Sequence, residues 1–313
     1  MNFLKITSTS CLSLILLFGC TDQETSSTTP QNAYAMTTNL KSNAFKDYWY
    51  QGKAEITSYD LEQVRYGEIR QGNAVMIFVT EDFSKKKQVK LDNPSATPDD
   101  AVSVLKLNMT RKFNTGIYPY SIMQSSFTPV DLEKYPNTLK VTSSSQEWCG
   151  HTFMQLNLKK NNYESEVRSY FESEGDTKTR LNKTLLEDEI WSIIRINPNK
   201  LPQGEIDIIP STIYARLRHI DFKNEKAIAS VEEKGSETHF QLQYKNLNRT
   251  LKIVFEKAFP HQIIAWEESS RSGYGGNTPT LTTKGKRKKS IMLDYWSKNG
   301  LGDSHYRAEL GLE

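Results

Sequence analysis

Cysteine, glycine and proline are scarce in this sequence, and neither sign of charge is in large excess. Its 313 residues include 3 Cys, 16 Gly and 11 Pro, and 40 Lys and Arg nearly cancel 37 Asp and Glu. So little Gly and Pro excludes a collagen-like chain and extended low-complexity disorder. The formal charge of +3 argues against a nucleic-acid-binding protein, because such proteins usually carry a strongly basic domain.

Long apolar runs are missing as well. The run Leu12–Phe18 (LSLILLF) follows Lys5, but it is much shorter than the ~20 residues that span a bilayer as a helix. A basic residue followed by a short apolar run is typical of an export signal. We therefore assign residues 1–19 to a signal peptide and exclude them from the fold.

The residues after this run, Leu17-Phe18-Gly19-Cys20, resemble the lipobox of bacterial lipoproteins. In that family the signal is cleaved just before the Cys, whose thiol and new amino terminus are acylated with chains such as palmitate. The resemblance implies Cys20 as the lipid attachment site and a membrane anchor, because buried acyl chains contribute ~0.8 kcal/mol per methylene. Thr21 stands where the inner-membrane retention signal has Asp, so we expect the outer membrane of a bacterial envelope.

Beyond the signal, Cys149 is the only thiol besides Cys20, so the exported domain has no internal disulfide and depends on core packing. Residues 20–43 are rich in Ser and Thr and poor in large apolar side chains, a composition that cannot bury enough surface to order itself. We predict a flexible tether there, with a root-mean-square span of roughly 25 Å. A β-rich envelope domain follows over residues 44–313.

From Phe45 onward, apolar and polar residues alternate with the period of two that is typical of β-strands. Six clear segments are Glu55–Leu61, Ala74–Thr80, Val102–Met109, Tyr163–Phe171, Thr238–Tyr244 and Leu251–Phe255. Turn sequences such as Lys160-Asn161-Asn162 recur at hairpin spacing. Consecutive strands predict a mainly β fold, an antiparallel meander that forms a curved sheet or half-barrel.

One segment departs from the β pattern. Thr184 is a candidate helix N-cap, Glu187 completes a capping box, and Pro198 ends the helix. Apolar residues on one face predict a single helix over about 184–197 that covers the open side of the curved sheet. Because the helix lies at the midpoint of the domain, an alternative is two β-lobes split near 184–198.

The segment Glu147–Thr152 (EWCGHT) resembles the start of a thioredoxin-like disulfide-exchange site, but Thr152 stands where the second Cys is required. On a strand, Cys149 and His151 share a face, which allows a Cys–His hydrolase or transferase as an alternative. We favour an inert, half-buried Cys in the wall of the sheet. The five His residues are dispersed, so no metal or cofactor is predicted.

A basic run precedes a predicted strand at 290–296. Its five charges within six residues are Lys284, Lys286, Arg287, Lys288 and Lys289. At a hairpin tip, such a run would contact anionic lipid headgroups. The alternative is a solvated edge that blocks aggregation.

Aromatic residues gather in three places, at Tyr48-Trp49-Tyr50, at Tyr118-Pro119-Tyr120 with Phe127, and at Tyr295-Trp296. Concave sheets lined by aromatic rings commonly hold apolar ligands, although the same residues fill ordinary β-cores. We favour the core interpretation and keep a lipid or other apolar ligand as the second.

Five segments of the chain resemble a group of flavobacterial envelope lipoproteins of similar length. They are YWYQGKAEITSYDLEQVRYGE (48–68), FVTEDFSKKKQVK (78–90), FNTGIYPYSIM (113–123), SSQEWCGHTFMQLNL (144–158) and LLEDEIW (185–191). Members are often labelled "septum formation inhibitor Maf". Maf nucleotide pyrophosphatases, however, have an α/β fold and a Ser-Pro-Arg-Arg motif that this chain lacks. The resemblance implies a β-rich envelope lipoprotein and no catalytic residues, and we expect a non-enzymatic protein that binds a lipid or other apolar molecule.

Overall fold

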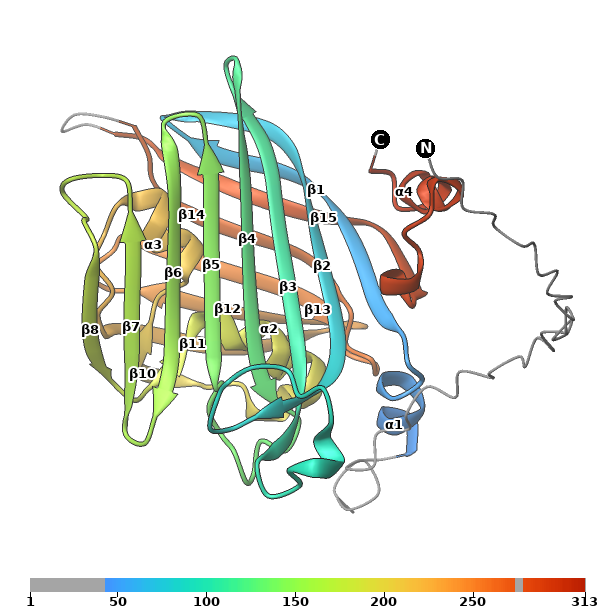
Figure 1. Cartoon of the computed structure of the whole chain (residues 1–313). Helices are drawn as coiled ribbons and strands as arrows, with labels where there is room; N and C mark the ends of the chain where they lie inside the picture. The colour runs from blue at the N-terminus through green and yellow to red at the C-terminus, as the bar shows by residue number, and fades with distance from the viewer. Residues whose placement is uncertain (1–42, 274–277, 313) are drawn as a thin grey trace, which may run out of the picture. The chain divides into compact units, whose positions relative to one another are not determined.

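The structure, a computed structural model, describes residues 43–273 and 278–312, all of which belong to one compact unit. This unit is mainly β, which confirms the predicted fold class (Figure 1). The strands are β1 (Ala54–Arg65), β2 (Glu68–Ser84), β3 (Ala101–Thr115), β4 (Tyr118–Pro129), β5 (Lys140–Glu147), β6 (Gly150–Lys159), β7 (Asn162–Ser169), β8 (Thr177–Asn182), β9 (Leu185–Leu186), β10 (Gly204–Ile209), β11 (Glu225–Lys234), β12 (Glu237–Tyr244), β13 (Arg249–Glu256), β14 (Ile263–Arg271) and β15 (Thr280–Leu293). The α-helices are α1 (Asn43–Trp49), α2 (Glu187–Ile196), α3 (Thr212–Arg218) and α4 (His305–Glu309), and short 3-10 turns are η2 (Pro94–Ala96), η3 (Pro198–Lys200), η4 (Tyr295–Ser297) and η5 (Leu301–Ser304).

The 15 strands of the described residues form one open sheet, in the order β8-β7-β6-β5-β4-β3-β2-β1-β15-β14-β13-β12-β11-β10-β9. Every neighbouring pair is antiparallel except β9 and β10. The same sheet therefore contains the strands on both sides of residues 184–198. Its edge strands β8 and β9 are joined by Lys183 and Thr184 alone, so the sheet must curl to bring its two edges together.

Side-chain alternation explains why these segments form strands. In β12, Thr238, Phe240, Leu242 and Tyr244 are buried, while the residues between them are more exposed. This is the period-two pattern of a strand with one face on the core. All six segments selected by alternation fall within or largely within observed strands, so their prediction is confirmed.

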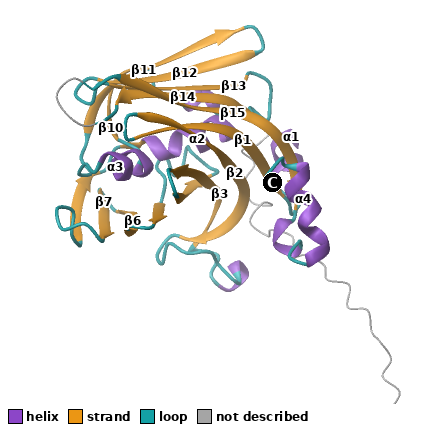
Figure 2. Ribbon diagram, turned by 90° about the horizontal axis from the view of Figure 1, so that it is seen from above, coloured by secondary structure: helices purple, strands orange, loops and turns teal. Residues whose placement is uncertain are grey.

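The predicted helix is present as α2, but it lies in the interior. All ten of its residues are buried, and it sits between the two layers of the curled sheet (Figure 2). The predicted N-cap is wrong: the Thr184 hydroxyl instead donates to the Asp207 carbonyl at 2.6 Å. Leu186 caps the helix, because Leu185 and Leu186 form β9 and the Leu186 N–H donates to Glu189 at 2.9 Å.

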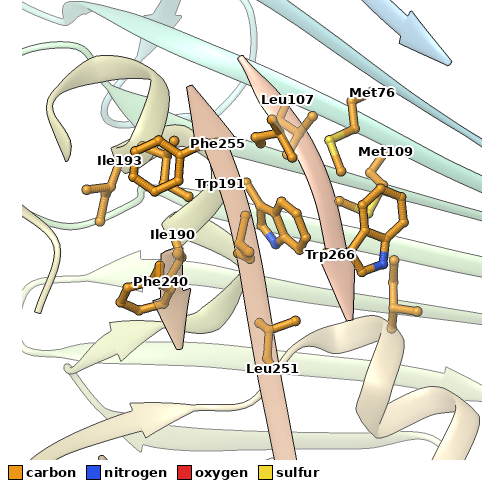
Figure 3. Close-up of a cluster of buried hydrophobic side chains, with 14 of the residues drawn as sticks. Met76, Leu107, Met109, Ile190, Trp191, Ile193, Phe240, Leu251, Phe255 and Trp266 are labelled. Atoms are coloured by element: carbon orange, nitrogen blue, oxygen red, sulfur yellow. The ribbon is translucent and has the colours of Figure 1, made fainter. Parts of the chain in front are cut away.

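The main core is built around α2. Ile190, Trp191 and Ile193 of the helix lie between side chains from β2 and β3 and side chains from β12 to β14 (Figure 3). Trp191 and Trp266 meet edge to face at 5.8 Å. The helix thus fills the inside of the curled sheet and joins its two layers.

A second helix in the interior, α3, was not predicted from the sequence. Ser211 caps it by accepting a hydrogen bond from the Ile213 N–H at 3.2 Å, and His219 ends it in the left-handed conformation, with φ of 53°. Six of its seven residues are buried. With α1 and α4, it makes the described unit richer in helix than the one-helix prediction.

The outer face of β1, β2 and β15 is covered by the segment that contains α4. Leu310, together with Leu312 and Tyr295, packs against Ile56, Val75 and neighbouring side chains there. Both faces of β2 are therefore apolar, which explains its continuous hydrophobic run. Among the described residues, no helix has the length and apolar character needed to cross a bilayer.

Candidate functional site

The predicted lipid attachment site, Cys20, lies outside the described residues, as do the signal peptide and nearly all of the tether. Acylation at Cys20 stays a prediction from the sequence.

Cys149 lies at the exposed tip of the β5–β6 hairpin, in the two-residue turn with Trp148. The expected half-buried position in the wall of the sheet is therefore wrong, because β5 already ends at Glu147. The Cys149 N–H donates to the Glu147 carboxylate at 2.7 Å. A side-chain hydrogen bond to Glu147 and the charge of that carboxylate raise the pKa of the Cys149 thiol above its ordinary value.

His151 is exposed on β6, and no hydrogen bond links it to Cys149 within the described ranges. A nucleophilic Cys needs a lowered pKa and a base in contact with it. Cys149 has a raised pKa and no such contact, so this geometry does not form a Cys–His pair. Nor do the described residues contain a group of His, Cys, Asp and Glu that would hold a metal ion.

The basic run lies in the middle of β15 rather than at a hairpin tip, because this strand continues to Leu293; it pairs with β14 as far as Lys286 and with β1 from Lys284 onward. Lys284 stands opposite Glu62 and Glu267, and Lys286 stands opposite Asp60. Arg287 forms an ion pair with Glu256 at 2.8 Å, and Lys288 lies 3.5 Å from Asp60. Lys289 is exposed and stands opposite Ser58. Acidic neighbours thus compensate much of the positive charge.

The aromatic clusters contribute mainly to packing. Trp49 is fully buried, Tyr120 is buried and stacks on Phe113 at 4.9 Å, and Phe127 stacks on Phe83 at 4.7 Å. Trp296 is the exception, with half of its surface exposed. The space inside the curved sheet, where the sequence predicted an apolar ligand, is filled by α2 and its neighbours.

Three successive buried carboxylates begin α2 and hold three different segments. Glu187 forms a two-point ion pair with Arg249 of β13. Asp188 accepts from the Thr212 N–H of α3 at 3.0 Å, and Glu189 accepts from the Thr138 N–H before β5 at 2.7 Å. This cluster anchors the helix and explains why the acidic residues of the segment lie inside.

Asp188 and Glu189 have no cationic partner among the described residues, and burial is the main influence on their pKa values. Desolvation raises the pKa of Asp188 to about 6 and that of Glu189 to about 7, although backbone N–H donors act in the opposite direction. Both groups hold structural segments together and lie away from solvent, so they are components of the core.

A cleft of about 540 Å³ lies beside α1. Its wall is part apolar and part polar and comes from α1, the end of α2 and the ends of β11 and β13; Phe45, Ile196, Pro198, Val231, Phe255 and Phe259 form the apolar part. Polar side chains such as Asn197, Glu233 and His261 stand among them. The volume falls within the range of about 300–1,000 Å³ that is typical of small-molecule sites.

A second, smaller cleft of about 190 Å³ lies at the other end of β1, and its wall is polar. Gln63, Arg65, Tyr66, Tyr214, Arg218 and Glu268 are among its lining residues. Glu268 is ionised, because Arg249 at 3.1 Å and Arg111 outweigh its burial and lower its pKa. Arg218 is exposed and forms no ion pair with any residue in the described ranges.

Arg65 is the unusual group in this polar cleft. It is 7% exposed, and its guanidinium donates to the Leu217 carbonyl, the Tyr66 hydroxyl and the Tyr120 hydroxyl. Its buried Nε has no hydrogen-bond partner, and no carboxylate within 43–273 and 278–312 pairs with it. A buried charge without a counter-charge is unfavourable, so this position suits an added anion.

Neither cleft was predicted from the sequence. The polar cleft combines the end of β1, the end of α3 and parts of β14 and β15, so its residues are separated by more than 200 positions. Arg65 does lie in the resembling segment 48–68, but a single Arg in a strand carries no signal of its own. Comparisons of this chain with protein-family models, with curated proteins and with solved structures give no significant match.

Proposed function

We propose that this protein is a lipid-anchored lipoprotein of the bacterial envelope, held in the outer membrane through acylated Cys20, and that it binds an apolar or lipid molecule without catalysing a reaction. The cleft beside α1 is the observation that supports ligand binding. It has the volume of a small-molecule site, and about half of its wall is apolar, with the side chains of Phe45, Phe255 and Phe259.

The position of this cleft also favours an apolar ligand. Ala44 and Phe45 of α1 line it, so the cleft lies where the predicted tether joins the domain. Phe259 keeps 37% of its surface exposed there, and covering such apolar surface stabilises a complex by about 25 cal/mol per Å².

The enzyme alternative has less support. Cys149 is exposed, has a raised pKa and is not hydrogen-bonded to His151 in the part of the chain that the structure describes. A thiol in this state is a poor nucleophile.

The anchor is tested by Cys20→Ser in the full chain. We expect the variant to accumulate as an unprocessed precursor or to move to the soluble fraction, and to take up no labelled palmitate. Equal palmitate labelling of the variant and the wild type would exclude Cys20 as the attachment site.

The ligand site is tested with two substitutions on one strand. Val231 lines the cleft, whereas Ile228, also on β11, is 40% exposed and does not line it. We expect Val231→Asp to weaken binding of a fluorescent C16 fatty acid at least tenfold, and Ile228→Asp to leave it unchanged. Equal binding by both variants would exclude this cleft.

A further inference from the structure

We infer that the end of the sheet farthest from α1 docks on an anionic phospholipid surface, with three exposed side chains in the bilayer interface and a lipid phosphate in the cleft of Arg65. This surface is distinct from the cleft beside α1 and does not depend on it.

The strand register brings the relevant turns to one end. Gln146 stands opposite Ser121 and His151, and Thr152 stands opposite Ser169. The β3–β4 turn, the β5–β6 turn and the residues after β7 therefore lie at the same end, where the first two hairpins project (Figure 1). The β1–β2 turn after Arg65 belongs to this end as well, because Gly72 stands opposite Phe113.

Each of these three turns carries a large, exposed apolar or aromatic side chain. Ile117 is 85% exposed, Trp148 is 68% exposed and Tyr170 is 69% exposed. Trp and Tyr concentrate at the level of the lipid headgroups in membrane-associated proteins. Met123 of β4 and Phe153 of β6, at 42% and 38% exposed, stand on either side of Ser144 of β5 near the same end.

Ring contacts connect these tips to the cationic cleft from two sides. Trp148 lies 6.3 Å from Tyr118, whose ring is 6.0 Å from that of Tyr120, and the Tyr120 hydroxyl accepts a hydrogen bond from Arg65 at 3.1 Å. On the other side, Tyr170 contacts Phe171, and Phe171 meets His219 at 5.2 Å. Ring contacts thus link the apolar tips to the cationic cleft at the same end of the sheet.

The charge of this cleft selects an anion. Arg65 and Arg218 form no ion pair in the described ranges. Glu268, the carboxylate in the wall, is already paired with Arg249 at 3.1 Å, and Glu174 with Arg216 at 3.5 Å. The volume of about 190 Å³ suits a phosphate group better than an acyl chain. Basic residues close to an anionic leaflet contribute about 1 kcal/mol each.

A bilayer fits this surface better than a folded partner does. The apolar side chains stand on three separate turns at the end that holds the cleft, and they form projections rather than a groove. Residues 20–42 reach up to ~80 Å when extended, while β1 is only ~40 Å long. The predicted anchor therefore allows this end to reach the same membrane.

Vesicle flotation of the chain from residue 43 to 313 tests the inference. This part contains the whole sheet and all four buried clusters, so it has a complete core of its own. We expect binding to phosphatidylcholine vesicles that contain phosphatidylglycerol, and weaker binding to phosphatidylcholine alone.

Two sets of variants separate the contributions. Ile117→Ser with Trp148→Ser should weaken binding to both vesicle types at least tenfold, because the apolar contact does not depend on lipid charge. Arg218→Gln should weaken only the binding to phosphatidylglycerol vesicles, by about fivefold. The matched control is Trp296→Ser with Leu301→Ser, which removes a 50% exposed Trp and a 98% exposed Leu from η4 and η5.

Three outcomes would overturn the inference. The first is an equal loss in the Trp296 and Leu301 control. The second is full binding by the tip variant together with loss in a Lys284, Lys286, Lys288 and Lys289 to Ser variant, which would assign docking to the run in β15. The third is that inorganic phosphate saturates the cleft beside Arg218 while flotation with phosphatidylglycerol vesicles stays unchanged. That result would show that the cleft binds a soluble anion and not a lipid phosphate. Unchanged flotation of Val231→Asp would support a surface separate from the α1 cleft.

Discussion

A buried arginine lies at each end of β1, Arg195 of α2 at one end and Arg65 of β1 itself at the other, and only one of them has a carboxylate partner. At the first end, Glu55 forms a two-point ion pair with Arg195, each hydrogen bond measuring 2.5 Å, and both residues are 1% exposed. At the other end, Arg65 is also buried, but its partners are a carbonyl, two hydroxyls and, at 3.4 Å, the ring Nε2 of His219. One arginine is neutralised by the fold itself and the other is not.

This difference distinguishes a structural charge from one that is available to a ligand. Burial opposes ionisation of Glu55, yet the Arg195 guanidinium outweighs it and lowers the pKa of Glu55. Arg195 also lies over the rings of Trp49 and Phe78, so it is part of the core. Arg65 has hydrogen bonds and an unpaired charge, and an anion in its cleft would complete the arrangement.

The largest effect is expected for Arg195→Leu. It leaves the Glu55 carboxylate buried without its cation, and breaking a buried ion pair in this way costs about 3–5 kcal/mol of unfolding free energy. Urea unfolding measures the loss. The double variant Glu55→Leu with Arg195→Leu should recover much of it, because it removes both charges; no recovery would show that packing, not charge, dominates at this end.

The next effect concerns pH and the buried carboxylate of Glu189. Its folded pKa of about 7 lies above the ordinary value of 4.5, so its contribution to stability is complete below pH 4.5 and is lost as pH rises through 7. The loss is on the order of 3 kcal/mol for a shift of this size. Asp188, with a pKa raised to about 6, acts in the same direction.

We therefore expect the unfolding free energy to fall between pH 5 and pH 8, and to fall less steeply in Glu189→Gln. At lower pH the sign reverses, because the lowered pKa values of Glu55 and Glu268 make stability fall as those groups become protonated. Denaturant titrations at several pH values measure both limbs. Parallel curves for Glu189→Gln and wild type would contradict the assignment to Glu189.

A smaller effect is expected for Arg65→Leu. The variant loses the hydrogen bonds of the guanidinium, but it also removes a buried charge that has no ion-pair partner, so the two effects largely offset each other. We expect a change of about 1 kcal/mol or less, well below that of Arg195→Leu. A loss as large as that of Arg195→Leu would remove the contrast between the two ends of β1.

The smallest effect is expected for Cys149→Ser. The thiol is exposed at a hairpin tip, so its replacement should leave the melting temperature unchanged. Its raised pKa also predicts slow alkylation near neutral pH. Rapid labelling by iodoacetamide, with loss of in-cell function in the Ser variant, would return the Cys–His alternative to consideration.

Strands were predictable because their cause is local. Alternation in segments such as Thr238–Tyr244 follows directly from having one face on the core, whatever the partner strand is. The interior position of α2 was not predictable in this way. Glu187, Asp188 and Glu189 belong at the surface by composition, and only Arg249, Thr212 and Thr138 from distant segments make their burial favourable.

The basic run shows the same limit. Five positive charges within six residues predicted an exposed tip, yet the run lies inside β15, paired with β1 throughout and with β14 up to Lys286, and acidic residues stand opposite. Gly285 interrupts the run for a packing reason, because a Cβ at this position would lie 2.1 Å from the Trp266 ring. A glycine inside a strand thus marks a close approach of an aromatic ring rather than a turn.

By itself, the sequence determined the mainly β class, most of the strand segments and the existence of the helix near 187–196, because periodicity and turn residues act over a few neighbouring positions. Only the tertiary structure decided which charges are neutralised. Glu55 meets Arg195 across 140 positions, while Arg65 is buried against Leu217 and Tyr120 and forms no ion pair in the described part of the chain. The physical reason is that a charge is stabilised by the groups the fold brings within a few ångströms of it, and those groups are distant in the chain.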